Sequence, residues 1–123
     1  MAIAQALRTL LAAGRFQDAL ARYRELADGP EGRRPDVRLL GATAATRLGQ
    51  LAVGAALADE ALEQFRARGD RDGSMRALNL LGAIHWERGY LAEAERCFGE
   101  ALELARQLED SLMLARACNN LAS

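Results

Sequence analysis

Residues 75–106 read MRALNLLGAIHWERGYLAEAERCFGEALELAR, and the architecture of the chain can be inferred from this stretch outward. Gly89 divides it into two runs of helical character. Small and apolar residues follow the glycine at offsets of two, five, nine and twelve positions, namely Leu91, Ala94, Phe98 and Ala101. Those offsets place the four side chains on one stripe of an α-helix. The stretch is therefore predicted to form two helices joined by a tight glycine turn.

The same spacing follows two earlier glycines. Gly14 leads to Phe16, Ala19, Tyr23 and Leu26, and Gly49 leads to Leu51, Gly54, Ala58 and Ala61. The second and third units match further when Gly49 is aligned with Gly89, because Glu60, Leu62, Glu63 and Arg66 then fall on Glu100, Leu102, Glu103 and Arg106. We call this superposition of the two units the repeat alignment.

A fourth unit begins near the end of the sequence. In the repeat alignment Arg76, Ala77, Asn79 and Leu81 fall on Arg116, Ala117, Asn119 and Leu121. A recurring unit of this kind, made of helix pairs, predicts a solenoid.

We expect an all-α single domain over residues 1–123, with repeats at about 1–34, 35–74 and 75–114 and a started fourth repeat at 115–123. The pattern predicts seven helices, at roughly 2–13, 16–28, 36–48, 51–68, 74–88, 91–108 and 112–122. Asp36, Ser74 and Ser111 are the expected N-caps of the helices that they precede or begin. A short turn is expected at Glu109, Asp110 and Ser111.

The stretch from Met75 to Arg106 resembles the tetratricopeptide repeat. Leu81 and Gly82 supply the leucine-glycine pair, His85 stands where that family usually has tyrosine, and Ala94, Phe98 and Ala101 follow in register after the turn at Gly89. The second unit departs from the pattern, since Gly54 and Ala58 hold the small and aromatic positions and its Leu40-Gly41 pair lies one residue out of register.

That resemblance implies a right-handed superhelical stack of antiparallel helix hairpins. The 40-residue spacing and the segments RALNLLG and ARACNNLA are similar to a subset of the family found in kinesin light chains, spindle-orientation adaptors and bacterial peptide-sensing regulators. In that subset, asparagines on the first helix of each repeat hold the backbone of an extended peptide.

Five residues are the candidate peptide-binding site: Arg76, Asn79, Trp86, Arg116 and Asn119. In a stack of hairpins the first helices line a groove, and the spacing of Arg76, Asn79 and Trp86 puts them on one helical face. An asparagine offers both a donor and an acceptor to a peptide backbone, and an arginine can hold a carboxylate. The alternative is structural, with the asparagines bonded to neighbouring helices and the arginines paired with surface glutamates.

Other classes of function lack support in the sequence. All sixteen basic residues are arginines, seventeen acidic residues balance them, and the isoelectric point is 5.9, so we expect no nucleic-acid partner. No window is apolar enough to predict a membrane span.

His85 has no companion ligands, and no nucleophile, metal-ligand or phosphate-binding motif occurs, so we expect no catalysis, metal or cofactor. Cys97 and Cys118 lack a CxxC arrangement, which favours a reducing, cytoplasmic location.

The sequence therefore favours a non-catalytic protein-protein interaction module that binds an extended peptide. A sensory or regulatory domain of a larger signalling or transcription-regulating protein is the alternative, as is a self-associating scaffold. Helix 112–122 has an apolar face in a repeat that is only started, so a homodimer through that segment is also expected.

Overall fold

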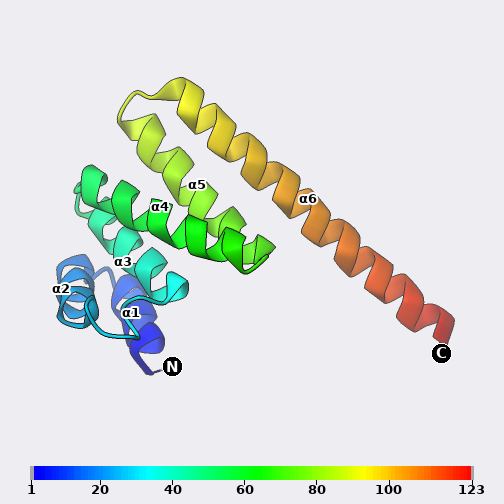
Figure 1. Cartoon of the computed structure of the whole chain (residues 1–123), viewed down its shortest axis with the longest axis horizontal. Coiled ribbons are helices and arrows are strands. Elements are labelled where there is room, and N and C mark those ends of the chain that lie inside the picture. The colour runs from blue at the N-terminus through cyan, green and yellow to red at the C-terminus, as the bar shows by residue number, and fades with distance from the viewer. Residues whose placement is uncertain (1, 123) are drawn as a thin grey trace.

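The computed structural model describes residues 2–122, with side chains described for residues 3–112. Within that range the chain is helical with short connections and has no strand, which confirms the all-α prediction (Figure 1). The helices are α1 (Ala2–Ala12), α2 (Phe16–Leu26), α3 (Pro35–Arg47), α4 (Leu51–Ala67), α5 (Arg71–Glu87) and α6 (Leu91–Ala122).

The helices pack as successive antiparallel hairpins, α1 with α2, α3 with α4 and α5 with α6. Each hairpin also packs on the next, because α2 contacts α3 and α4 contacts α5. The first helices of the three hairpins lie along one side of the stack, with α3 touching both α1 and α5. This arrangement is the predicted solenoid of helix pairs.

The three repeated glycines end their helices as predicted, with φ angles of 75° at Gly14, 80° at Gly49 and 80° at Gly89. Gly69 is a fourth such residue, with φ of 67°. In each case the residue after the glycine donates its backbone N–H to the carbonyl five positions earlier, at 2.8–2.9 Å. This is the bonding of a Schellman turn, and it satisfies carbonyls that the helix end would otherwise leave unpaired.

The core is built largely from alanine and leucine. One cluster lies among α3, α4, α5 and α6 and a second among α1, α2 and α3, and Leu57 packs against both. Ala58, Ala61 and Ala77 are fully buried. Small side chains at these positions let neighbouring helices approach closely, so the two clusters form one continuous apolar interior.

Gly41 lies one residue out of register with Gly82 of the next repeat, and the two glycines meet different neighbours. A methyl group at Gly82 would meet the ring of Phe98, which lies on the second helix of the same hairpin. A methyl group at Gly41 would meet the ring of Tyr23, which belongs to the preceding hairpin. Ala42, fully buried, takes the position that corresponds to Gly82. The irregular second unit thus reflects packing on the aromatic residue of the first.

All three expected N-caps were wrong, those of α5 and α3 for the reasons that follow. Helix α5 begins at Arg71 and not at 74, because the Asp70 side chain accepts a 2.8 Å hydrogen bond from the Gly73 amide and caps the helix three residues earlier. Ser74 is buried in the first turn and donates to the Asp70 carbonyl. Helix α3 begins at Pro35, so Asp36 lies inside its first turn, where its charge suits the helix dipole.

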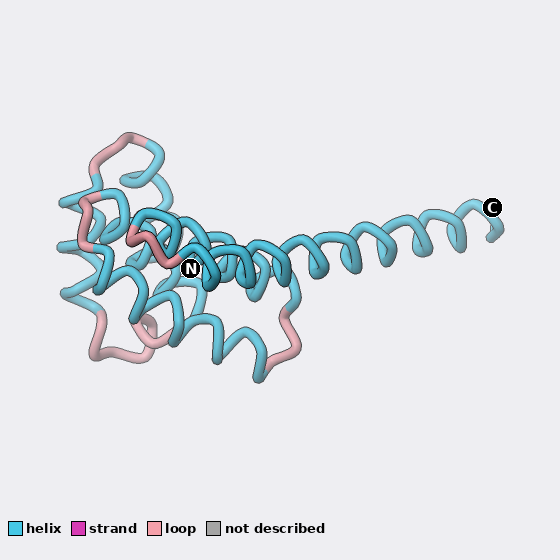
Figure 2. The backbone as a smooth tube through the Cα atoms, turned by 90° about the horizontal axis from the view of Figure 1, so that it is seen from above, coloured by secondary structure: helices cyan, strands magenta, loops and turns pink. Residues whose placement is uncertain are grey.

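The predicted turn at 109–111 was also wrong, and with it the count of seven helices. Helix α6 runs without a break from Leu91 to Ala122, and its last turns project away from the stack (Figures 1 and 2). In the repeat alignment Glu109 stands where Gly69 ends α4, and glutamate does not readily adopt a positive φ. Ser111, expected to cap a new helix, instead donates to the Gln107 carbonyl at 3.0 Å.

Ion pairs also favour an unbroken α6. The guanidinium of Arg106 pairs with Glu103 on the preceding turn and with Asp110 on the following one, the latter at 3.1 Å. Such pairs support a helix modestly. Together with the missing glycine, they explain why the segment that looks like a turn in the sequence continues as helix.

A pair of glycine substitutions tests the close contact at Gly41. Glycine to alanine inside a helix normally stabilises by about 1 kcal/mol, and we expect that gain at Gly99→Ala, where a methyl group meets nothing within 4 Å. At Gly41→Ala the methyl group would lie 2.7 Å from the ring of Tyr23, which is only 4% exposed. We expect a net loss of about 1–3 kcal/mol there, measured by urea unfolding. A gain at both sites would contradict the packing described.

Candidate functional site

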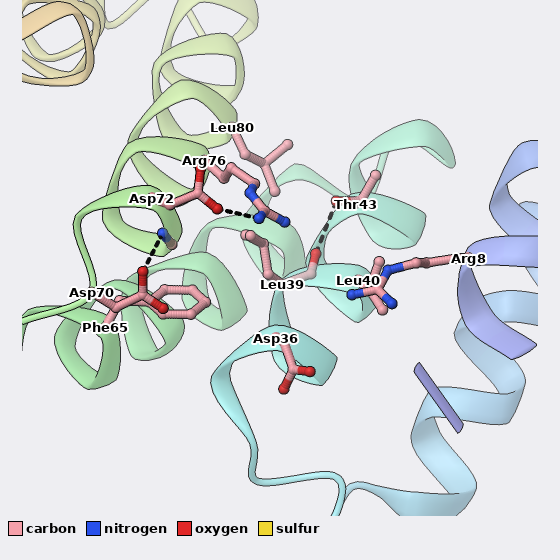
Figure 3. A pocket seen from close by; sticks show the side chains of 11 residues that line it. Arg8, Asp36, Leu39, Leu40, Thr43, Phe65, Asp70, Asp72, Arg76 and Leu80 are labelled. Atoms are coloured by element: carbon pink, nitrogen blue, oxygen red, sulfur yellow. Dashed lines mark hydrogen bonds and ion pairs between the residues drawn. The ribbon is translucent and has the colours of Figure 1, made fainter. Parts of the chain in front are cut away.

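A hollow lined by both polar and apolar side chains lies where the first helices of the three hairpins meet. This first hollow has a volume of about 320 Å³. Figure 3 shows its walls coming from α1, α3 and α5, with the end of α4 closing one side. Its lining consists of Arg8, Asp36, Leu39, Leu40, Thr43, Phe65, Asp70, Asp72, Gly73, Arg76 and Leu80.

The interior of the first hollow is apolar and its edge is charged. Leu39, Leu40 and Leu80 are half-buried there, so part of each side chain remains open to a ligand. Figure 3 shows the guanidinium groups of Arg8 and Arg76 extending into the hollow from opposite sides. An apolar floor with a few polar groups at its edge is typical of a binding site.

Most of the charged groups at this edge already have partners. Arg76 pairs with Asp72 one turn earlier on α5, Asp36 pairs with Arg34 at 3.1 Å, and Asp70 caps α5. Arg8 makes no ion pair with any side chain that the structure describes. The guanidinium of Arg8 is therefore the charge most open to an incoming carboxylate.

Two further hollows continue the first along α5. The second, of about 350 Å³, shares Thr43 and Leu80 with the first, and the third, of about 420 Å³, shares Ala83 and Glu87 with the second. The third is lined by Trp86 and Phe98 as well and is almost wholly apolar. The three hollows thus follow one another along the side of the stack formed by the first helices. We call this surface the groove.

The structure places three of the five predicted site residues on or beside the groove. Arg76 lines the first hollow, and Trp86, 62% exposed, lines the third. Asn79 is exposed on the same helical face but lines none of the three hollows. Arg116 and Asn119 lie outside the residues whose side chains are described, so their part in the site stays a prediction.

The structural alternative is supported for the arginine and not for the asparagine. Arg76 does pair with an acid, although the acid is Asp72 rather than a glutamate. Asn79 makes no side-chain hydrogen bond with another described residue. Its amide therefore has its donors and its acceptor available to a ligand.

Several residues that line the groove were not predicted from the sequence, since the predicted site residues all lie in the third and fourth repeats. Arg8, Leu39 and Thr43 come from the first helices of the first two repeats. The repeat alignment could have indicated two further lining residues, Thr43 and Thr46, because they correspond to Ala83 and Trp86. All four residues line the groove.

The other reactive side chains lie apart from the groove. Burial, followed by the nearby Glu100 carboxylate, raises the pKa of the Cys97 thiol, which keeps it protonated and a poor nucleophile at neutral pH. His85 is half-buried, and its buried Nδ1 has no hydrogen-bond partner among the described residues. The described part of the chain holds no grouping of three or more side chains suited to a metal ion. It also has no helix apolar and long enough to cross a bilayer.

The central part of the chain matches a known protein family. Residues 37–107, more than half of the chain, match the family model described as tetratricopeptide repeat. The match covers α3, α4 and α5 almost entirely and the first half of α6. A search of the curated proteins found no match.

Substitution of Asn79 can distinguish a role in ligand binding from a role in holding the helices together. We expect Asn79→Ala to change the free energy of unfolding by less than about 0.5 kcal/mol, because the side chain is exposed and makes no hydrogen bond with a described residue. Asp70→Ala, which removes the cap of α5, is the matched comparison and is expected to cost about 1 kcal/mol. Thermal and urea unfolding measure both. A loss at Asn79 as large as that at Asp70 would favour the structural role.

Proposed function

The chain belongs to the tetratricopeptide repeat family, and we propose that this repeat domain binds an extended segment of another protein in the groove along α1, α3 and α5. Repeats of this family generally mediate protein-protein interaction, so the class of function follows from membership. The groove as binding site and the extended form of the ligand are our proposal.

The observation that carries the proposal is the continuity of the groove. Each hollow shares two lining residues with the next one. The first and second share Thr43 and Leu80, and the second and third share Ala83 and Glu87. A compact small molecule would fill one of them. A strand-like peptide, at about 3.3 Å per residue, is the ligand whose length suits all three.

The chemistry of the groove suggests how the peptide is held. The leucines of the first hollow offer a place for an apolar side chain, and Trp86 with Phe98 offers a second at the far end. Arg8 can hold a carboxylate by forked hydrogen bonds, with Arg76 facing it across the hollow. Asn79 can pair with a backbone amide or carbonyl whatever the side chain beside it. We therefore propose a ligand with two apolar residues and an acidic group near one of them.

The role is non-catalytic in our proposal. The groove brings together leucines, threonines, a tryptophan and charged side chains, and none of these has the nucleophile-and-base arrangement that covalent chemistry needs. Cys97, a potential nucleophile with a described side chain, is kept protonated away from the groove.

Selection from a displayed random-peptide library against the full chain tests the function. Enriched peptides would be synthesised and their affinity measured by fluorescence anisotropy for the wild type, Asn79→Ala and Arg8→Ala. We expect each substitution to weaken binding by roughly tenfold, since a hydrogen bond to a charged or polar partner contributes about 1.5 kcal/mol.

Arg22→Ala is the control for that measurement. Arg22 is also an exposed helical arginine, but it lies on α2 and pairs with Glu25 outside the groove. Its removal should leave the affinity unchanged. Peptides that bind equally well to all four proteins would place the binding surface elsewhere and reject the groove.

A further inference from the structure

An apolar face of α6 lies open where the corresponding face of α4 is covered. In the repeat alignment Leu62 corresponds to Leu102. Leu62 is 6% exposed, whereas Leu102 is 72% exposed. The side of the third hairpin that should receive the next helix therefore presents a large apolar side chain to solvent.

The covering element in the earlier repeat is α5, which follows the turn at Gly69 and packs along α4. Its counterpart in the later repeat is the segment 112–122, which continues α6 in a straight line away from the face (Figure 2). Because the two segments share the pattern of arginine, alanine, asparagine and leucine described above, 112–122 has the sequence of a helix that covers such a face.

A complementary change in size supports the same pairing. In the earlier repeat Gly73 of α5 sits directly against the ring of Phe65 of α4, where a methyl group would lie 2.2 Å from the ring. In the repeat alignment this large-small pair becomes Ala105 and Met113, a small residue on the face and a large one on the covering segment. Exchanges that conserve the combined volume are those that a packed interface tolerates.

We propose that the open face of α6 is covered by residues 112–122 of a second copy of this chain, in a reciprocal exchange. Residues of the same copy cannot cover it while α6 is straight, because Ala105 and Met113 are eight residues apart on one helix, about 12 Å at 1.5 Å per residue. Pairing 105 of one copy with 113 of the other places the two α6 helices antiparallel, with a two-fold axis near Glu109.

The exchange has two physical consequences. It brings Arg116 and Asn119 of one copy beside α5 of the other, in the places that continue the line of Arg76 and Asn79. It also brings the two Glu109 carboxylates close to each other at the axis, where like charges repel. The dimer is thus expected to tighten on Glu109→Gln.

A designed disulfide tests the pairing in the full chain. In a background with Cys97→Ala and Cys118→Ala, the double variant Ala105→Cys, Met113→Cys is oxidised and run on a non-reducing gel. The two new cysteines are too far apart to join within one straight helix, since a disulfide needs Cα atoms within about 7 Å. A covalent dimer is expected, with Ala105→Cys alone remaining monomeric on the gel. An internal disulfide in a monomer, or no disulfide, would overturn the exchange.

Light scattering across a range of protein concentration provides the second test. The wild type should form dimers as concentration rises, and Leu102→Asp should weaken dimerisation by at least roughly tenfold, since a charge replaces an apolar side chain at the interface. Val53→Asp is the matched control, because Val53 is an exposed apolar residue on α4 whose counterpart in the repeat alignment is Glu93. A wild type that stays monomeric, or equal effects at both sites, would overturn the proposal.

Discussion

Glycine in the left-handed region sets the points at which this chain folds back. Four of the five connections between helices contain one glycine with φ between 67° and 80°, and each carries the same backbone hydrogen bond. Other residues suffer a steric penalty in that conformation, so the glycines set the lengths of the helices and the antiparallel sense of the hairpins. Where Glu109 takes the corresponding place, the helix continues instead.

The groove is a consequence of how the hairpins stack. Each hairpin leaves apolar residues uncovered, and stacking the next hairpin on it buries them. Fully buried alanines and the glycines set against aromatic rings keep the helices close. The first helices then lie side by side, and the spaces between their side chains become the hollows that share Leu80 and Ala83. The shape of the groove and the stability of the fold therefore depend on the same small residues.

Electrostatics shape the groove more than they stabilise the fold. The ion pairs of the described residues are largely exposed, and exposed pairs contribute little to stability. Pairing of Arg76 with Asp72 and of Arg34 with Asp36 reduces the charge that the first hollow presents, and Arg8 is the arginine of its lining that has no ion pair with a described side chain. Within the first hollow, selectivity for a ligand would then rest on this one charge and on the apolar floor.

The repeat, the turns at Gly14, Gly49 and Gly89, and the exposed face that carries Arg76, Asn79 and Trp86 could all be predicted from the order of the residues. These features follow from local chemistry, because helical spacing and the backbone freedom of glycine act within a few residues. The packing of Gly41 on Tyr23, the presence of Arg8 and Arg76 in the lining of one hollow and the joining of the three hollows could not be predicted in this way. Each depends on residues from different hairpins, whose distances are set only when the hairpins stack.

The consequences of the unbroken helix α6 could be predicted from the sequence only in part. The loss of a turn glycine at Glu109 is visible in the sequence, since the repeat alignment places that residue on Gly69. The exposure of Leu102 that results is visible only in the folded chain, because the burial of its counterpart Leu62 depends on a helix from the next hairpin.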